Sequence, residues 1–174
     1  MKGDDKNTLL AAVYEYVKKY STLPENCIFQ GGNNFSHLPP KQNNFTVISL
    51  LNISQEGTSA YAYADDSVTV SNTLKAAVQV DIYGNTLPEA YANMEKVHGY
   101  FRGQLACDFF IPRGFEPLYA DDVKEIMIPD VSRKYVPRLT TSLYFAYKSV
   151  LREPYKTFNN AEIHIKNVDV YKEL

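Results

Sequence analysis

The chain has 174 residues, of which 45% are hydrophobic and 22% charged, and its formal net charge is -2. This composition excludes a disordered chain, and the weak charge gives no general attraction to nucleic acid or anionic lipid. No apolar run reaches the roughly 20 residues that span a bilayer, and Cys27 and Cys107 lack the spacing of a disulfide framework or a metal site. We therefore expect a single domain over residues 1–174, made in the cytoplasm, with no cofactor and no membrane contact.

The N-terminal segment predicts a helix over about residues 6–20. Its apolar residues fall on one helical stripe, and Lys18 and Lys19 stand near its end, where positive charge favours the helix dipole. Residues 21–44 contain two adjacent glycines and the pair Pro39-Pro40, which favour turns and remove backbone donors. We expect a long ordered loop or extended arm there.

Residues 45–83 predict the centre of a sheet. Residues 45–53 are β-branched and almost continuously apolar, which is typical of an interior strand. Residues 55–58 predict a turn. Beyond it, alternating tyrosines and valines predict two further extended pieces with a bend at Asp65-Asp66, and residues 74–83 predict another strand.

A second helix is predicted to begin at residues 86–89, Thr-Leu-Pro-Glu. This is a capping box, in which the threonine hydroxyl and the glutamate carboxylate each accept a hydrogen bond from the other residue's backbone amide. The apolar stripe of this helix ends at Gly103, and residues 105–110 form a short amphipathic piece. Prolines punctuate residues 112–137, which we interpret as a structured connection without a long helix or a central strand.

The C-terminal part predicts two more strands. Residues 138–150 alternate along a half-exposed strand, and residues 163–170 alternate with a phase change at Asn167, which is typical of an edge strand with a bulge. The order of elements predicts an α+β fold with a mainly antiparallel β-sheet. Two principal helices pack on one face of it, and a long β-hairpin and an extended loop arm project from it.

Two copies of Tyr-Ala-Asp-Asp, at residues 63–66 and 119–122, come closest to an active-site motif, because some nucleotide polymerases hold Mg²⁺ with such a hairpin. That chemistry also needs a carboxylate from a neighbouring strand and a phosphate-binding fold, which the length and basic content do not provide. His37, His98 and His164 show no metal-ligand spacing. We therefore predict turns at the Asp pairs, and no catalytic, cofactor-binding or metal residues.

Several segments in succession resemble one family of virus proteins. They are residues 78–84 (Val-Gln-Val-Asp-Ile-Tyr-Gly), the helix that follows, the Asp108-Phe-Phe segment, residues 117–122 (Pro-Leu-Tyr-Ala-Asp-Asp) and the strand at residues 139–147. Together they resemble the phage neck terminator, or tail terminator, family. The family has no catalytic residues to transfer.

The resemblance implies a structural virion protein that forms a ring, commonly of six subunits, at the head–tail junction of a tailed bacteriophage. Such a ring caps the tail tube and provides the docking surface for head-completion or connector proteins. The expected partners are copies of the chain itself, the tail tube protein and the head-completion proteins, with transient contact to genomic DNA in the channel. We also expect a monomer that closes into a ring on its template.

A ring requires a heterologous contact, in which one patch of a subunit meets a different patch of the next. Residues 31–40 and 54–71 are long excursions that a single core does not need, so we expect contacts there. The exposed side of the strand at residues 138–148 and the C-terminal strand supply charge complementarity or edge pairing. The candidate interface residues are Phe35, Tyr61, Tyr63, Arg133, Arg138, Tyr144, Lys148 and Ile163.

Two alternatives stay open. A head-completion or adaptor protein of the same neck differs only in its partner and its ring number. A small metal-dependent hydrolase that uses Asp121, Asp122 and a histidine is disfavoured, because no acid–base or ligand set converges by spacing. The basic cluster that includes Arg133 and Arg138 fits a solvated face, an acidic neighbour or channel DNA.

Overall fold

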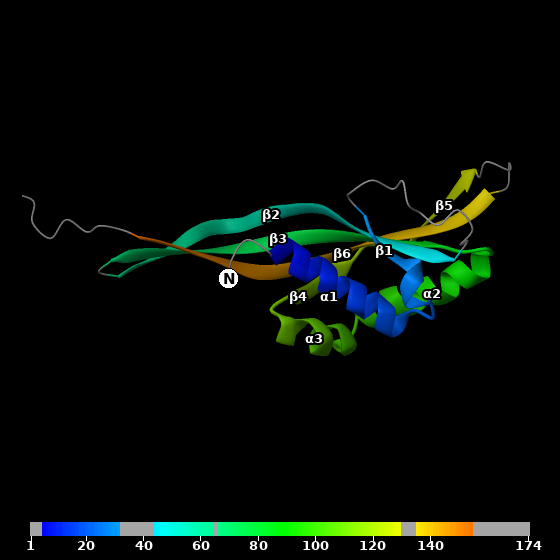
Figure 1. Ribbon diagram of the computed structural model, residues 1–174, viewed down its shortest axis with the longest axis horizontal. Helices are drawn as coiled ribbons and strands as arrows, with labels where there is room; N and C mark the ends of the chain where they lie inside the picture. The colour runs from blue at the N-terminus through cyan, green and yellow to red at the C-terminus, as the bar shows by residue number, and fades with distance from the viewer. Residues whose placement is uncertain (1–4, 32–43, 65, 130–134, 155–174) are drawn as a thin grey trace, which may run out of the picture.

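The sheet of this protein combines long strands and short strands (Figure 1). The computed structural model describes residues 5–31, 44–64, 66–129 and 135–154. Within these residues the six-stranded sheet has the order β1-β2-β3-β6-β4, with β5 also paired to β6, and the pairing is antiparallel except between β1 and β2. The predicted α+β class with a mainly antiparallel sheet is therefore confirmed. The strands are β1 (Ile28–Gln30), β2 (Phe45–Ala64), β3 (Ser67–Tyr83), β4 (Glu116–Ala120), β5 (Lys124–Pro129) and β6 (Tyr135–Pro154).

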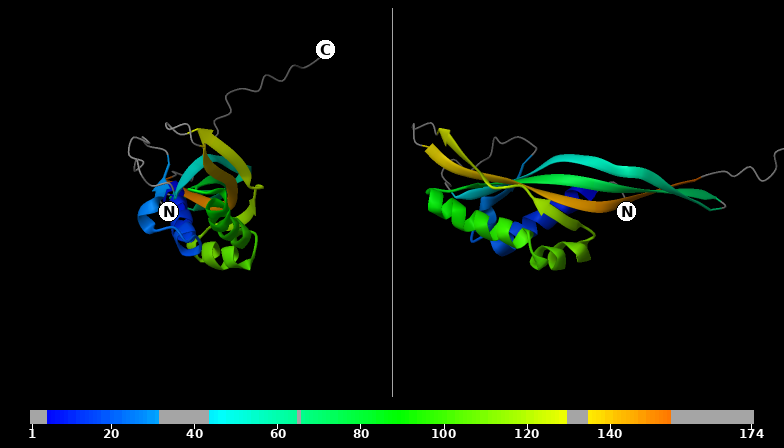
Figure 2. Two further views of the ribbon diagram at one scale, coloured as in Figure 1. Left: turned by 90° about the vertical axis from the view of Figure 1, so that its right-hand side faces the viewer. Right: turned by 180° about the vertical axis from the view of Figure 1, so that it is seen from behind.

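The α-helices of the described residues lie on one side of the sheet (Figure 2). They are α1 (Asp5–Tyr20), α2 (Leu87–Phe101) and α3 (Gln104–Phe110), and the single 3₁₀ turns are η1 (Glu25–Cys27) and η3 (Ile111–Arg113). The second helix begins where the sequence predicts it. The hydroxyl of Thr86 accepts a hydrogen bond from the backbone amide of Glu89 at 3.4 Å, which satisfies one of the amides that a helix start leaves without a partner.

An aromatic cluster joins the helices to the sheet. The ring of Tyr16 in α1 lies 5.0 Å from that of Phe110 in α3, and Phe110 lies 4.9 Å from Phe145 in β6. The hydroxyl of Tyr16 donates to the carbonyl of Val97 in α2 at 3.0 Å, and burial raises the pKa of Tyr16. A buried hydroxyl without a hydrogen-bond partner lowers the free energy of unfolding. This bond therefore favours one orientation of the Tyr16 ring between α2 and α3.

The alternation predicted for β6 is confirmed. Leu139, Leu143 and Phe145 are fully buried on the side that faces the helices. Tyr144 and Lys148 fall on the other side, where Tyr144 is half-buried and Lys148 is exposed. The period of two thus reports correctly which face of the strand belongs to the core.

β2 does not turn at residues 55–58, so the predicted turn is wrong. The strand continues to Ala64, and its pairing with β3 has a register shift between Glu56 and Ala60. Gly57 has a φ of 76°, in the left-handed region that glycine adopts without strain. A bulge of this kind bends and twists a strand without ending it. β2 and β3 therefore form one long hairpin on either side of the predicted bend at Asp65-Asp66.

The sequence pattern misses three short strands. β1 falls in the segment interpreted as a loop and pairs in parallel with β2, Ile28 opposite Thr46. Three residues are too few to show an alternation. β4 and β5 fall in the proline-rich connection and lie one after the other along β6. Pro117 is tolerated in β4 because an edge strand keeps one side unpaired. The strand predicted at residues 163–170 and most of the loop arm at residues 31–40 lie outside the described residues.

Replacing Phe145 with alanine removes the ring that joins α3 to the sheet, and we expect the free energy of unfolding to fall by about 3–5 kcal/mol. Tyr61, on the exposed end of β2, is a matched control, and alanine there should change this free energy by less than about 1 kcal/mol. Urea denaturation of both variants measures the difference. Equal losses would contradict the placement of the core.

Candidate subunit-contact surface

The three long strands run beyond the helices as a three-stranded arm (Figures 1 and 2). We define the arm as residues 54–64 of β2, 67–73 of β3 and 148–154 of β6, which pair with one another. Tyr61 and Tyr63 are 60% and 66% exposed on it, although both lie on a strand whose other end is part of the core. The arm is therefore a continuation of the sheet that no helix of the described residues covers.

One face of the arm continues the helix-facing side of the sheet. Residues an even number of positions apart on a strand share a face, so Leu151 lies on the same side of β6 as the buried Phe145. The pairing places Leu151 beside Val70 of β3, and Val70 beside Tyr61 of β2. Tyr63 follows on the same face. The apolar side that the helices cover in the body is thus exposed along the arm.

The opposite face of the arm carries mainly small and polar side chains. One row across it consists of Ala62, Thr69 and Arg152. The guanidinium of Arg152 donates to the hydroxyl of Ser67 from Nε at 3.1 Å and from Nη2 at 2.9 Å. Lys148 lies on the same face and is exposed. An antiparallel sheet of this kind is stable in water on its polar face but needs a cover on its apolar face.

The residues predicted for the interface do not form one patch. Tyr61 and Tyr63 lie together on the apolar face, with ring centroids 6.5 Å apart and ring planes at 16°. The predicted residues of β6 belong to the opposite face of the sheet. They are Arg138, Tyr144 and Lys148. The other predicted residues lie outside the part of the chain that the structure describes. They are Phe35, Arg133 and Ile163.

Arg138 is engaged inside its own subunit. Its Nη2 atom lies 2.8 Å from Oδ2 of Asp81, and the two side chains are 23% and 6% exposed. The amide of Gln79 donates to the same carboxylate oxygen at 2.8 Å. Since a carboxylate buried without a cation is strongly unfavourable, this guanidinium serves the stability of the sheet.

Tyr144 belongs to a small cluster on the polar side of the sheet. Its ring stacks on that of Tyr119 in β4, with centroids 4.4 Å apart, and its hydroxyl donates to Oδ2 of Asp121 at 3.1 Å. The ammonium of Lys75 lies 5.2 and 5.3 Å from the two ring centroids, which is the distance of a cation–π contact. Burial, followed by the bond to Asp121, raises the pKa of Tyr144. These contacts attach β4 to β6.

Asp121, the residue favoured by the hydrolase alternative, has structural contacts. Its backbone amide donates to the carbonyl of Ser142 at 2.9 Å, and its own carbonyl accepts from the hydroxyl of Thr141 at 2.7 Å. Nε2 of His98 lies 3.0 Å from that carbonyl, not from the carboxylate. The Asp pair therefore ends β4 and ties its last residues to β6. Within the described residues, no three His, Cys, Asp or Glu side chains gather where they would hold a metal ion.

Sequence reasoning misses two exposed apolar residues of the long strands. Leu51 and Leu151 are both 52% exposed. Leu51 falls at a register shift between Leu50 and Asn52, where the alternation that would assign its face is broken. Leu151 continues the alternation of β6 beyond the predicted end at residue 150, so extending the predicted strand by one residue would have found it.

An exposed apolar face next to a well-packed core is typical of proteins that bind other proteins. A family model described as phage neck terminator protein matches residues 7–169 of the 174-residue chain. The chain therefore belongs to the phage neck terminator family, as the sequence resemblance predicts, and is a structural component of the phage neck. Comparison with curated proteins gives no match. None of the described helices is both long and apolar enough to cross a membrane.

Removing Arg138 leaves the carboxylate of Asp81 buried without its cation. We expect Arg138→Met to lower the free energy of unfolding by about 1–3 kcal/mol, since Gln79 still donates one hydrogen bond. Lys148→Met removes the same charge from an exposed position and should change this free energy by less than about 0.5 kcal/mol. Thermal denaturation of the two variants compares them. A small effect at Arg138 would mean that its charge is available to a partner.

Proposed function

We propose that this protein forms a ring of six subunits at the head–tail junction, where it caps the tail tube and presents the docking surface for head-completion proteins. Membership of the phage neck terminator family supports the location. The exposed apolar face of the arm is the observation that supports assembly by contact between copies. In this proposal the whole chain acts as one domain, has no catalytic role and is assembled into the virion in the host cytoplasm.

The arm supplies one half of the contact that a ring needs. In a cyclic ring each subunit presents one patch to the neighbour on one side and a different patch to the neighbour on the other. Tyr61, Val70 and Leu151 form an apolar row across the arm, and the arm runs beyond the helices of its own subunit (Figure 1). A neighbouring subunit within reach of the arm can cover this row.

Tyr61 and Tyr63 are the strongest anchors of this patch. A tyrosine buries on the order of 150–250 Å² when it is fully covered, and these two rings are the most exposed of the large apolar side chains on the arm. Aromatic residues often dominate the free energy of association at protein interfaces. The contact should therefore depend on the two rings more than on the rest of the arm.

The polar face of the arm suits the water-filled side of a ring. Lys148 and Arg152 lie on this face together with Glu56, and the guanidinium of Arg152 lies 3.9 Å from the carboxylate of Asp66. Because these charges offset one another, the face is hydrated but does not attract the phosphates of DNA strongly. In the proposed ring, contact with the genomic DNA that passes through the neck is therefore transient.

Replacing both Tyr61 and Tyr63 with serine removes the two rings and leaves the backbone pairing of the arm intact. If each ring contributes about 2 kcal/mol as an anchor, association should weaken by at least about a hundredfold. The measurement is the titre of a phage that lacks the gene and receives the variant from a plasmid. We expect a fall of two or more orders of magnitude.

The matched control changes Ala62 and Ala64 to serine, on the opposite face of the same strand. These substitutions introduce the same side chain and should leave the titre within about threefold of wild type, because exposed changes of this size have small effects. Thermal denaturation of both purified variants separates loss of contact from loss of folding. Equal titres for the two double variants would contradict a role for the apolar face.

An image of the virion neck with this chain located in it tests the ring directly. We expect six copies in one closed ring between tail tube and head, each with its arm against the next copy. A ring of a different number in contact with the head portal, and not with the tube, would instead support a head-completion or adaptor protein.

A further inference from the structure

The edge of β6 is covered along only part of its length. β5 pairs with residues 135–140 and β4 pairs with residues 143–146 on the same edge. The strand then continues for seven residues, Lys148 to Pro154, with β3 on one side and no strand of the described residues on the other. The backbone amides and carbonyls of such an edge form a template for one more strand.

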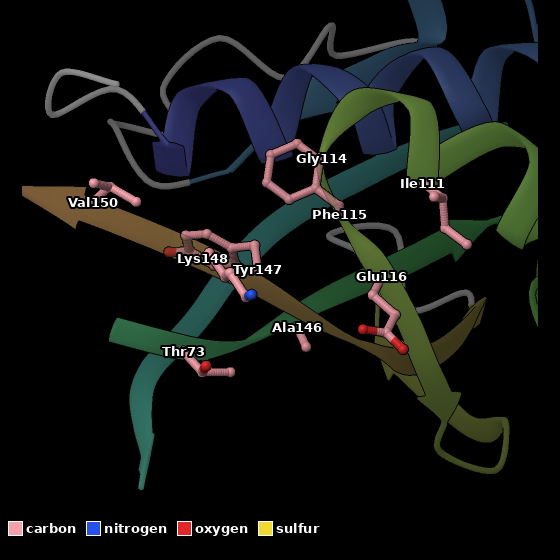
Figure 3. Close-up of a pocket in the computed structure, with 9 residues that line it drawn as sticks. All are labelled: Thr73, Ile111, Gly114, Phe115, Glu116, Ala146, Tyr147, Lys148 and Val150. Atoms are coloured by element: carbon pink, nitrogen blue, oxygen red, sulfur yellow. The ribbon is translucent and has the colours of Figure 1, made fainter. Parts of the chain in front are cut away.

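A groove begins where this open edge begins. It has a volume of about 510 Å³ and lies between the turn that precedes β4 and the edge of β6 (Figure 3). Ile111 and Phe115 line it from the turn, and Ala146, Lys148 and Val150 line it from β6. A strand added to the open edge would lie in line with β4 and would place a side chain in this groove.

We propose that residues 161–171 of a neighbouring copy add to this edge as a strand and insert an apolar side chain into the groove. The proposal rests on the proposed ring, because it needs a second copy within reach. Ile163, Ile165, Val168 and Val170 alternate with polar residues in that segment, which is the pattern of a strand with one apolar face. The open edge of seven residues is about 23 Å long at about 3.3 Å per residue, so it can pair with seven of these eleven residues.

The position of Pro154 favours a neighbouring copy, rather than the same chain, as the donor of the added strand. β6 carries the chain away from the body to the far end of the arm, where residues 155–174 follow (Figure 1). A return of residues 161–171 onto the same edge would need residues 155–160 to reverse the chain at the end of the arm. These six residues contain Asn159-Asn160 but no glycine, the residue that hairpin turns most often use. Residues 155–174 can span roughly 65 Å when extended, which is enough to reach an adjacent subunit.

Disulfide trapping in assembled virions tests this strand exchange. Cys27 and Cys107 are first changed to alanine. One chain then carries Val150→Cys in the groove, and a second, distinguished by a short N-terminal tag, carries Ile165→Cys, Val168→Cys or Val170→Cys in turn. Both are supplied together to a phage that lacks the gene. We expect a covalent dimer of one tagged and one untagged chain for at least one of the three donor positions on a non-reducing gel.

The matched control replaces Val150→Cys with Glu95→Cys, an exposed position on α2. It should give less than about a tenth of the covalent dimer, because surface thiols that are not held together in the assembly react slowly. Thermal denaturation within about 2 °C of the cysteine-free parent confirms that each variant folds.

Two results would overturn the strand exchange. In a chain that carries Val150→Cys and a donor cysteine together, a disulfide within one chain and no covalent dimer would assign the edge to the chain's own C-terminal segment. Virions of normal titre with no disulfide from any donor position would mean that residues 161–171 do not lie on the open edge of β6. Neither result would change the ring seen in images of the neck, so this inference can fail while the proposed function stands.

Discussion

A sheet with one apolar face needs a cover on that face, and in this protein the cover is shorter than the sheet. The strands β3 and β6 keep the same alternation from end to end, and β2 returns to it on the arm after two register shifts, but the helices pack only on the half that contains Phe145. The other half exposes Tyr61, Tyr63 and Leu151 on the continuation of the same face. Because apolar surface of this kind is unfavourable in water, the proposed contact with a neighbouring subunit would stabilise this half of the sheet.

The body of the subunit is stabilised by contacts that involve no residue of the arm. The rings of Tyr16, Phe110 and Phe145 hold the helices against the sheet, while Asp121 ties the end of β4 to β6. On the polar side, Arg138 neutralises Asp81. All of these lie at the helix-covered end of the long strands. The stability of the body and the exposed apolar face of the arm therefore depend on different residues, so substitutions on the arm can change the proposed contact without unfolding the body.

The sequence predicts the elements in which one local signal dominates. The capping residues at Thr86 and the period of two in β6 each have a single physical meaning, and both predictions hold. The turn at residues 55–58 fails because Gly57 suits a turn and a bulge equally, and only pairing with β3 decides between them. Tyr61 and Tyr63 are found as exposed from their place in a long excursion. The ion pair of Arg138 within its own subunit is not predicted, because its partner Asp81 is 57 positions away in the sequence.

Strands serve a contact arm better than a loop would, because their shape is fixed before the partner arrives. Ordering a loop at an interface costs conformational entropy that reduces the affinity. Tyr61 and Tyr63 instead stand on a strand whose backbone is already paired with β3, which in turn is paired with β6. The bulge near Gly57 adds twist to the base of the arm, so a change there would redirect both rings at once. In the proposed ring, the angle between subunits would therefore depend on the strand pairing of each subunit as much as on the side chains in contact.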